Sequence, residues 1–490
     1  MRRPATTLAG VIALTAGALV APQVVLGHQL VGRVESPLPL VAYLAGAALA
    51  VALSFAFVIL RDVRAPAHPR SSEVIAPRWL TLGLRAIGLL GWSWIVAQTI
   101  IGGPIDEADV AVLFLWIYGW VGVAFVSALV GPIWRWLDPF STLYDLGAAT
   151  LRRLGFRGWE PSPYPAGLGL WPAVAGLAFF VWLELAYKGG GLGVVVIGYT
   201  VLTLLAMASF GRDAWRTNGE TFSVWFGTLN RLAPFGSLPA EVAPGPADRS
   251  LVRRPYATGL LAGDWAMARV ALVAVGVGSI LYDGLSQTQA WFDAFGAPFL
   301  PLATVELLAW LALIVGVALI VGRVVGLPAV GGGLVPIAIG YLIAHYLTYI
   351  LGDGQRLVVA LSDPFQQGWN LLGFAAYEPG IGWIPPVLLW AVMLLAVVGG
   401  HVVGAWSGHV LAVSGQRATS TLRLRQVPLA ALMVALTATT LWSLGQTIVK
   451  EPPESTSAAL IAHAAAGAAA GPAQVAAPPE DESLLVGDAH

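Results

Sequence analysis

Residues 336–367 read PIAIGYLIAHYLTYILGDGQRLVVALSDPFQQ and begin with an apolar segment that carries His345. Helical spacing puts Tyr341 and Tyr349 on the same face as His345. A titratable side chain inside a bilayer is costly unless it faces protein or water. This face is therefore a candidate functional site. The alternative is a histidine that only packs against a neighbouring helix and donates one hydrogen bond to it.

The composition places the chain among membrane proteins. Apolar residues make up 57% of the sequence and charged residues 11%, against about 25% charged residues in soluble domains. The chain has no cysteine, which excludes disulfides, thiolate metal sites, iron–sulfur clusters and cysteine nucleophiles. We expect the partner to be a lipid bilayer and not a nucleic acid.

Ten apolar runs are long enough to span a bilayer and follow an N-terminal signal segment. They predict an all-α, polytopic protein of the bacterial inner membrane. The predicted helices are residues 38–60, 84–101, 110–130, 170–187, 192–210, 268–285, 301–321, 334–351, 384–410 and 427–449.

The two ends of the chain differ from this central part. Residues 1–27 read as a secretory signal peptide, with an Arg-Arg pair before an apolar run, and the alternative is an uncleaved signal anchor. Residues 28–450 form the predicted transmembrane domain. Residues 451–490 are rich in alanine, proline and acidic residues, which predicts a disordered extracytoplasmic tail.

The arginines give the topology. Most of the 26 basic residues fall in the loops after the first, third, fifth, seventh and ninth predicted helices. The positive-inside rule then puts His28 and the C-terminus on the extracytoplasmic side. Two of the inner loops, residues 133–168 and 212–264, are long and rich in tryptophan and arginine. We expect short interfacial helices there, anchored at the lipid headgroups.

Ionisable residues in the predicted spans lie at a similar depth. A helical rise of about 1.5 Å per residue places Glu184, Glu306 and His345 roughly 7–11 Å below the outer surface. Asp283 closes the sixth predicted helix on the same side, and Asp353 lies in the loop above His345. These side chains are predicted to share one outward-facing polar site.

Histidine and carboxylate side chains are ligands for a divalent metal, such as zinc or copper, whose bound water becomes a nucleophile. The predicted metal ligands are His28, Asp283, Glu306 and His345. The predicted catalytic residues are Glu184, Asp283 and Asp353, with Glu184 or Asp353 as the general base. The alternative is that each carboxylate pairs locally, as Glu184 would with Lys188 four residues later.

A second pair of histidines, His401 and His409, lies in the ninth predicted helix beside a glycine stripe at residues 400, 404 and 408. Small residues at this spacing favour close helix packing. We expect these two histidines to support that contact. The usual motifs of zinc proteases, serine hydrolases and P-loop NTPases are absent from the chain.

Five short motifs together resemble bacterial membrane proteins of the fenitrothion hydrolase-like family. They are HQLVGR at 28–33, PLP at 37–39, YDGLS at 282–286, AHYL at 344–347 and SDP at 362–364. The similarity extends from the first of these motifs to the tenth predicted helix. It implies a membrane-bound hydrolase of organophosphate esters.

The chain departs from that family at Gln29, where a glycine is expected in the usual His-Gly start. The sequence therefore allows three functions. The first is a metal-dependent ester or organophosphate hydrolase acting on a small-molecule substrate. The second is a transporter or channel for protons, metal ions or a small solute, in which buried ionisable residues form the path. The third is a non-catalytic, metal-handling membrane partner.

Overall fold

The computed structural model describes residues 40–61, 71–102, 110–156, 160–188, 191–237, 248–262, 264–296, 299–413, 419–444 and 446. The predicted signal segment, the predicted metal ligand His28 and the predicted C-terminal tail lie outside these residues.

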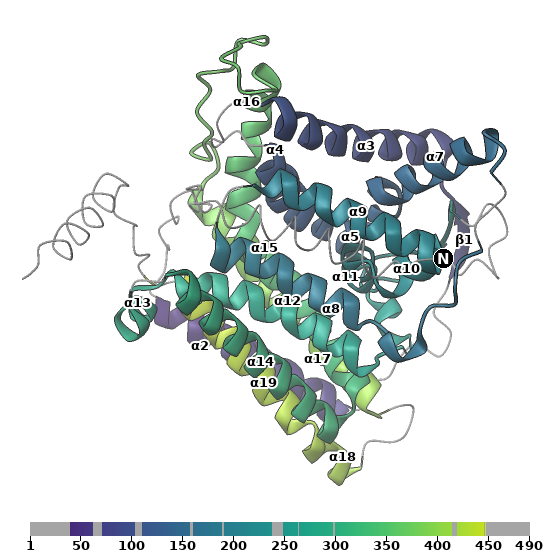
Figure 1. Cartoon of the computed structure of the whole chain (residues 1–490). Helices are drawn as coiled ribbons and strands as arrows, with labels where there is room; N and C mark the ends of the chain where they lie inside the picture. Colours follow the sequence, from purple (N-terminus) through teal and green to yellow (C-terminus); the bar gives the residue numbers. More distant parts are fainter. Residues whose placement is uncertain are drawn as a thin grey trace, which may run out of the picture. The chain divides into compact units, whose positions relative to one another are not determined.

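Long apolar helices dominate the described residues, and eight of them are long and apolar enough to cross a membrane (Figure 1). These eight are Arg78–Ile101, Val110–Leu129, Leu192–Phe210, Met267–Ser286, Leu300–Val325, Leu327–Ser362, Pro386–Val413 and Thr421–Ser443. Two shorter apolar helices are Leu49–Leu60 and Trp171–Tyr187. The protein is therefore a multi-pass, helical membrane protein.

Each of the ten predicted spans coincides with one of these apolar helices. The helices before the first long loop are α2 (Leu40–Arg61), α3 (Arg78–Ile101) and the continuous unit α4 (Val110–Val112), η1 (Leu113–Val123) and α5 (Ala124–Leu129). The next two are α8 (Trp171–Trp182) with η3 (Leu183–Tyr187), and α9 (Leu192–Phe210). The last five are α12 (Met267–Ser286), α14 (Leu300–Val325), α15 (Leu327–Gly352), α17 (Pro386–Val413) and α19 (Val427–Leu444). Ten membrane crossings remain a prediction, because two of the helices are short.

The helices α12 and α15 lie at the centre of the fold, and nearly all of their residues are buried. By contrast, α3 exposes large apolar side chains such as Trp79 and Leu90. Because lipid tails solvate apolar side chains, this difference identifies α3 as a lipid-facing helix and α12 and α15 as interior helices.

The contact between α15 and α17 is built on glycine, as predicted. A Cβ atom at Gly404 would lie 2.5 Å from the backbone oxygen of Gly333, and one at Gly400 would lie 2.5 Å from that of Pro336. The two backbones therefore touch directly. Ser407 adds a hydrogen bond of 2.9 Å from its Oγ to the oxygen of Gly332.

The two long loops, which the positive-inside rule predicts to be cytoplasmic, contain the expected short helices. These are α6 (Trp134–Leu137), α7 (Pro139–Arg153), α10 (Arg212–Asn218) and α11 (Thr221–Leu229), with α18 (Ser420–Arg425) before the last span. The sequence did not predict the antiparallel three-stranded sheet, which pairs a strand before α3 with two strands of the loop at 212–264. Its order is β1 (Ser72–Ile75), β3 (Ser250–Arg253) and β2 (Phe235–Ser237).

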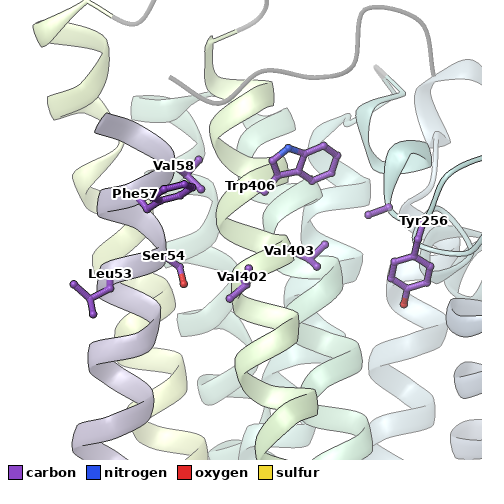
Figure 2. Close-up of a pocket in the computed structure, with 9 residues that line it drawn as sticks. Leu53, Ser54, Phe57, Val58, Tyr256, Val402, Val403 and Trp406 are labelled. Carbon is purple, nitrogen blue, oxygen red and sulfur yellow. The ribbon is translucent and has the colours of Figure 1, made fainter. Parts of the chain in front are cut away.

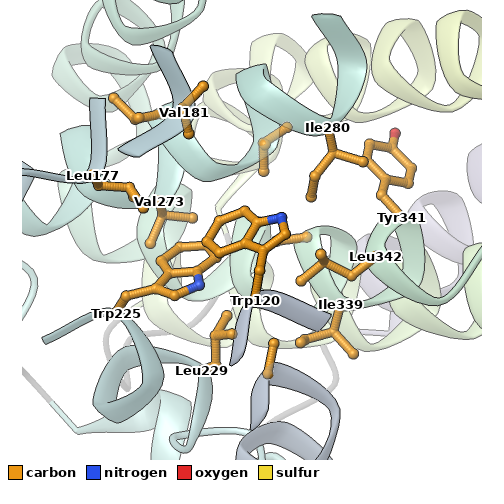
Figure 3. Packing of buried hydrophobic residues seen from close by; sticks show 14 of the residues in the cluster. Trp120, Leu177, Val181, Trp225, Leu229, Val273, Ile280, Ile339, Tyr341 and Leu342 are labelled. Atoms are coloured by element: carbon orange, nitrogen blue, oxygen red, sulfur yellow. The ribbon is translucent and has the colours of Figure 1, made fainter. Parts of the chain in front are cut away.

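The prediction that the aromatic side chains of these loops lie at the headgroups is wrong for α11. Trp225 is fully buried and stacks on Trp120 of η1, with ring centroids 5.6 Å apart (Figure 3). At the start of α11, the buried Glu220 carboxylate accepts the backbone N–H of Ser223 at 2.6 Å. Burial raises the pKa of Glu220. This cap satisfies the first backbone N–H groups of α11, whose aromatic side chains pack in the core.

The substitution Gly404→Ala tests the glycine contact. The new methyl group must push the backbones of α15 and α17 apart, so we expect unfolding at lower temperature and a loss of about 1–3 kcal/mol of stability. Gly399→Ala is the matched control, because a Cβ atom there has no neighbour within 4 Å. Thermal unfolding in detergent is the measurement. Equal melting temperatures for the two variants would contradict the close contact.

Candidate functional site

Asp283 and His345 meet in the interior of the fold. Nε2 of His345 on α15 lies 2.8 Å from Oδ2 of Asp283 on α12. Asp283 is 2% exposed and His345 is 6% exposed. The structure therefore joins an acid and a base, 62 residues apart in the sequence, in a nearly water-free place.

Two more side chains donate to the Asp283 carboxylate. The Tyr346 hydroxyl lies 2.8 Å from Oδ2, and Nε2 of Gln287, one turn later on α12, lies 2.7 Å from Oδ1. Both oxygens thus accept side-chain hydrogen bonds. Asp283 is therefore arranged to orient His345.

The hydrogen bond to Asp283 also selects the tautomer of His345. A proton on Nε2 makes the strong bond to the carboxylate and leaves the lone pair on Nδ1. Among the described residues, Nδ1 has no hydrogen-bond partner. Nδ1 is therefore the atom at which a proton, a water or a metal would bind.

A glycine makes room for this arrangement. A Cβ atom at Gly284 would lie 3.7 Å from Cε1 of His345 and 3.0 Å from Oγ of Ser443 on α19. Three helices, α12, α15 and α19, therefore meet at the histidine. Consecutive helical residues point in different directions, so Asp283 reaches His345 on α15 while Gly284 leaves room for Ser443 on α19.

The other two predicted catalytic carboxylates lie around the same place. Tyr349, one turn after His345 on α15, is within electrostatic range of Glu184, Asp283 and Asp353. Glu184 belongs to η3, and Asp353 belongs to the short helix η6 (Asp353–Gln355) that follows α15. Both carboxylates are buried. We call Glu184, Asp283, His345, Tyr346, Tyr349 and Asp353 the buried acid–base cluster.

One local ion pair accompanies the cluster. Nε of Arg356 lies 3.1 Å from Oδ1 of Asp353 and offsets one negative charge. Lys188 does not do the same for Glu184. It is exposed, its φ of 45° closes η3, and no ion pair joins it to Glu184 within the described part of the chain. The local pairing considered for Glu184 is therefore not formed.

Glu306 lies apart from the cluster. Its Oε2 is 3.3 Å from Nε1 of Trp291 and 3.5 Å from the Tyr282 hydroxyl. Among the described residues, no hydrogen bond or ion pair joins Glu306 to Asp283 or His345. No group of three or more histidine, aspartate or glutamate side chains in the described ranges could hold a metal ion. The predicted metal, with His28 outside these ranges, stays a prediction.

Sequence reasoning missed Tyr346 and Gln287. Both had a signal, because Tyr346 follows His345 directly and Gln287 is four residues after Asp283, on the same helical face. It also missed the two π-helices, η1 and η3, which pack beside the cluster. Trp120 of η1 lies next to Tyr346. π-helical turns are rare in proteins, but those that occur are often found at functional sites.

A second polar group lies deeper along α15. Nδ1 of His401 donates to the backbone oxygen of Val397 at 2.7 Å, so its Nε2 is an acceptor. The hydroxyls of Thr437 and Tyr341 lie 2.6 Å and 3.3 Å from this Nε2. His401 is fully buried. It connects α17 to α15 and α19, which is the packing role expected from the sequence.

An apolar cavity lies elsewhere, between α2 and α17 (Figure 2). Its volume is about 650 Å³. It is lined by Leu53, Ser54, Phe57, Val58, Tyr256, Ala257, Val402, Val403 and Trp406. None of these residues belongs to the buried acid–base cluster, so the cavity is not part of that site.

Comparison of the chain with protein-family models, curated proteins and solved structures gives no match. The family suggested by the short motifs around Asp283 and His345 therefore stays a prediction. The function proposed below depends on the geometry of the buried acid–base cluster.

The substitution Tyr346→Phe tests the hydrogen bonds to Asp283. Removing one donor from a buried carboxylate should cost about 1 kcal/mol of stability. Tyr282→Phe is the control, because its hydroxyl makes only a 3.5 Å contact with Glu306. Thermal unfolding in detergent compares the two variants. A larger loss for Tyr282→Phe would contradict the assigned network.

Proposed function

We propose that this protein handles protons inside the membrane, as a proton-coupled transporter or channel in which Asp283 and His345 form the central acid–base pair. The observation that carries this proposal is the buried 2.8 Å contact between the two side chains. Ionisable residues within spanning helices are rare and costly, and they commonly mark proton or ion pathways.

The arrangement of side chains along α15 supports a proton path that extends beyond the Asp283–His345 pair. Tyr349, His345 and Tyr341 follow one another at four-residue spacing, so they lie about 6 Å apart along one face of the helix. Each has a protonatable neighbour from another element. Tyr349 is near Glu184 and Asp353, His345 contacts Asp283, and Tyr341 lies beside His401.

The enclosure of the cluster favours a small cargo. Its six side chains are each at most 7% exposed. A proton needs only a chain of hydrogen-bonded groups and water, whereas an organic ester would have to separate packed helices. The acid–base chemistry follows from the tautomer: Nδ1 of His345 accepts a proton, and the Asp283 carboxylate stabilises the resulting imidazolium.

Asp283→Asn tests this proposal. The amide cannot stabilise an imidazolium as a carboxylate does, so we expect proton flux into liposomes to fall to the level of protein-free vesicles. Flux is followed with a pH-sensitive dye enclosed in the vesicles, with a pH gradient and a potassium diffusion potential applied in turn.

Glu306→Gln is the matched control, because Glu306 is a carboxylate of a spanning helix outside the cluster. It should retain the wild-type flux. Wild-type vesicles that conduct no protons under either gradient, with or without added solutes, would contradict the proposal. Equal flux in Asp283→Asn and wild type would remove the assigned pair.

One observation favours a second candidate, an ester hydrolase. His345 is oriented by a carboxylate and has a free Nδ1 within the described residues, which is the arrangement of a general base. In this reaction Nδ1 takes a proton from a water molecule as the water oxygen attacks the phosphorus or acyl carbon, and the imidazolium then gives that proton to the departing alkoxide, which leaves as the alcohol. In a metal-dependent form of the reaction, Nδ1 would instead hold a zinc or copper ion that acidifies the water, and Glu184 or Asp353 would be the general base.

His345→Gln tests this second candidate. Hydrolysis of a chromogenic phosphotriester and the metal content of the purified protein should both fall, because the base and ligand atom is lost. His409→Gln is the control, since Nδ1 of His409 is 2.8 Å from Oε1 of Gln426 and outside the cluster. Unchanged hydrolysis and metal content in His345→Gln would exclude the site.

A further inference from the structure

The segment between α16 (Arg356–Ser362) and α17 exposes an unusual number of large apolar side chains. We call residues 364–385 the aromatic loop. Leu371 is 64% exposed and Trp383 is 72% exposed. The other exposed large side chains of the loop are Trp369, Leu372, Phe374 and Tyr377. Glu378 is the only charged residue in the loop.

The loop has a defined conformation. The Asp363 carboxylate accepts the backbone N–H groups of Gln367, Gly368 and Trp369 at 2.7–3.1 Å. The N–H of Leu371 donates to the backbone oxygen of Ser362 at 2.9 Å. The exposed apolar side chains are therefore presented by an ordered turn and not by an unstructured connection.

The start of the loop lies beside membrane-embedded turns of α3. Nε1 of Trp94 donates to the backbone oxygen of Pro364 at 2.8 Å. Trp94 is seven residues before Ile101, so this contact lies about 10 Å inward from the end of α3. Nε2 of Gln367 also lies 3.4 Å from the oxygen of Ile101. Figure 1 shows α16 next to this end of α3, with the loop extending beyond it.

The helix beside the loop faces lipid. Ile100 and Ile101, at the end that contacts the loop, are 71% and 57% exposed. An apolar loop placed next to a lipid-facing helix end, at the depth of the last helical turns, meets the boundary between headgroups and acyl chains. Tryptophan and tyrosine are enriched at that boundary because their rings are apolar and their N–H or O–H groups are polar.

We propose that the aromatic loop inserts into the bilayer interface, on the side where α3 ends, and binds phospholipid through Leu371, Leu372 and the surrounding aromatic rings. Hydrogen bonds also connect the aromatic loop to η6. The Tyr377 hydroxyl donates to Oε1 of Gln355, and Nε2 of Gln355 donates to the oxygen of Gly380 at 2.9 Å. Gln355 belongs to η6, the same short helix as Asp353.

The absence of cysteine allows a direct test on the full chain. Leu371→Cys and Glu378→Cys each provide one attachment point for an environment-sensitive fluorophore, and both positions are exposed. Each labelled protein is placed in phospholipid nanodiscs that contain lipids spin-labelled near the top of the acyl chain. The spin labels should quench the probe at residue 371 several-fold more than the probe at 378. Iodide in the water phase should show the opposite order.

Equal quenching of both probes by the spin-labelled lipids would overturn the proposal. A probe at residue 371 that is protected from both the lipids and iodide would overturn it as well, because a protein surface, such as a second copy of this chain, would then cover the loop. Unlabelled samples of both variants are compared by thermal unfolding, so that misfolding is recognised separately.

Discussion

The hydrogen bond between Asp283 and His345 is the constraint on which the interior of this protein depends. A carboxylate in a helical membrane protein is tolerated only when donors replace the water it has lost. Three side chains from two helices do so for Asp283. The same donors fix the relative position of α12 and α15, the two most buried helices, so the stability of the bundle and the chemistry of the site share one set of contacts.

Close backbone packing brings two further helices, α17 and α19, against α12 and α15. Glycine at residues 400 and 404 brings α17 against α15, and Gly284 lets α19 approach His345. In a bilayer, helices associate through van der Waals packing and hydrogen bonds, because lipid tails are as apolar as the side chains they replace. The buried polar contacts of His401 with Thr437 and Tyr341 depend on that approach.

Much of the site was predictable from its residue types. Glu184, Asp283, His345 and Asp353 stand out as rare ionisable groups toward one side of the predicted membrane. Asp283 and His345 are in direct contact, and Tyr349 is within electrostatic range of the three carboxylates. Glu306 has the same depth and the same residue type, but it points from α14 toward Trp291. Depth along a helix follows from counting residues, whereas the direction in which the side chain points depends on how the helix is rotated against its neighbours.

The sequence by itself determined the membrane class, the positions of the ten apolar helices and the glycine contact, because hydrophobic length and small-residue spacing are local properties. Only the tertiary structure decided that Asp283 bonds to His345 and that Tyr346 and Gln287 support it. It also decided that Trp225 is buried in the core and that β1 pairs with the distant strand β3. These pairings join residues far apart in the chain, and no local pattern specifies which faces of two helices meet.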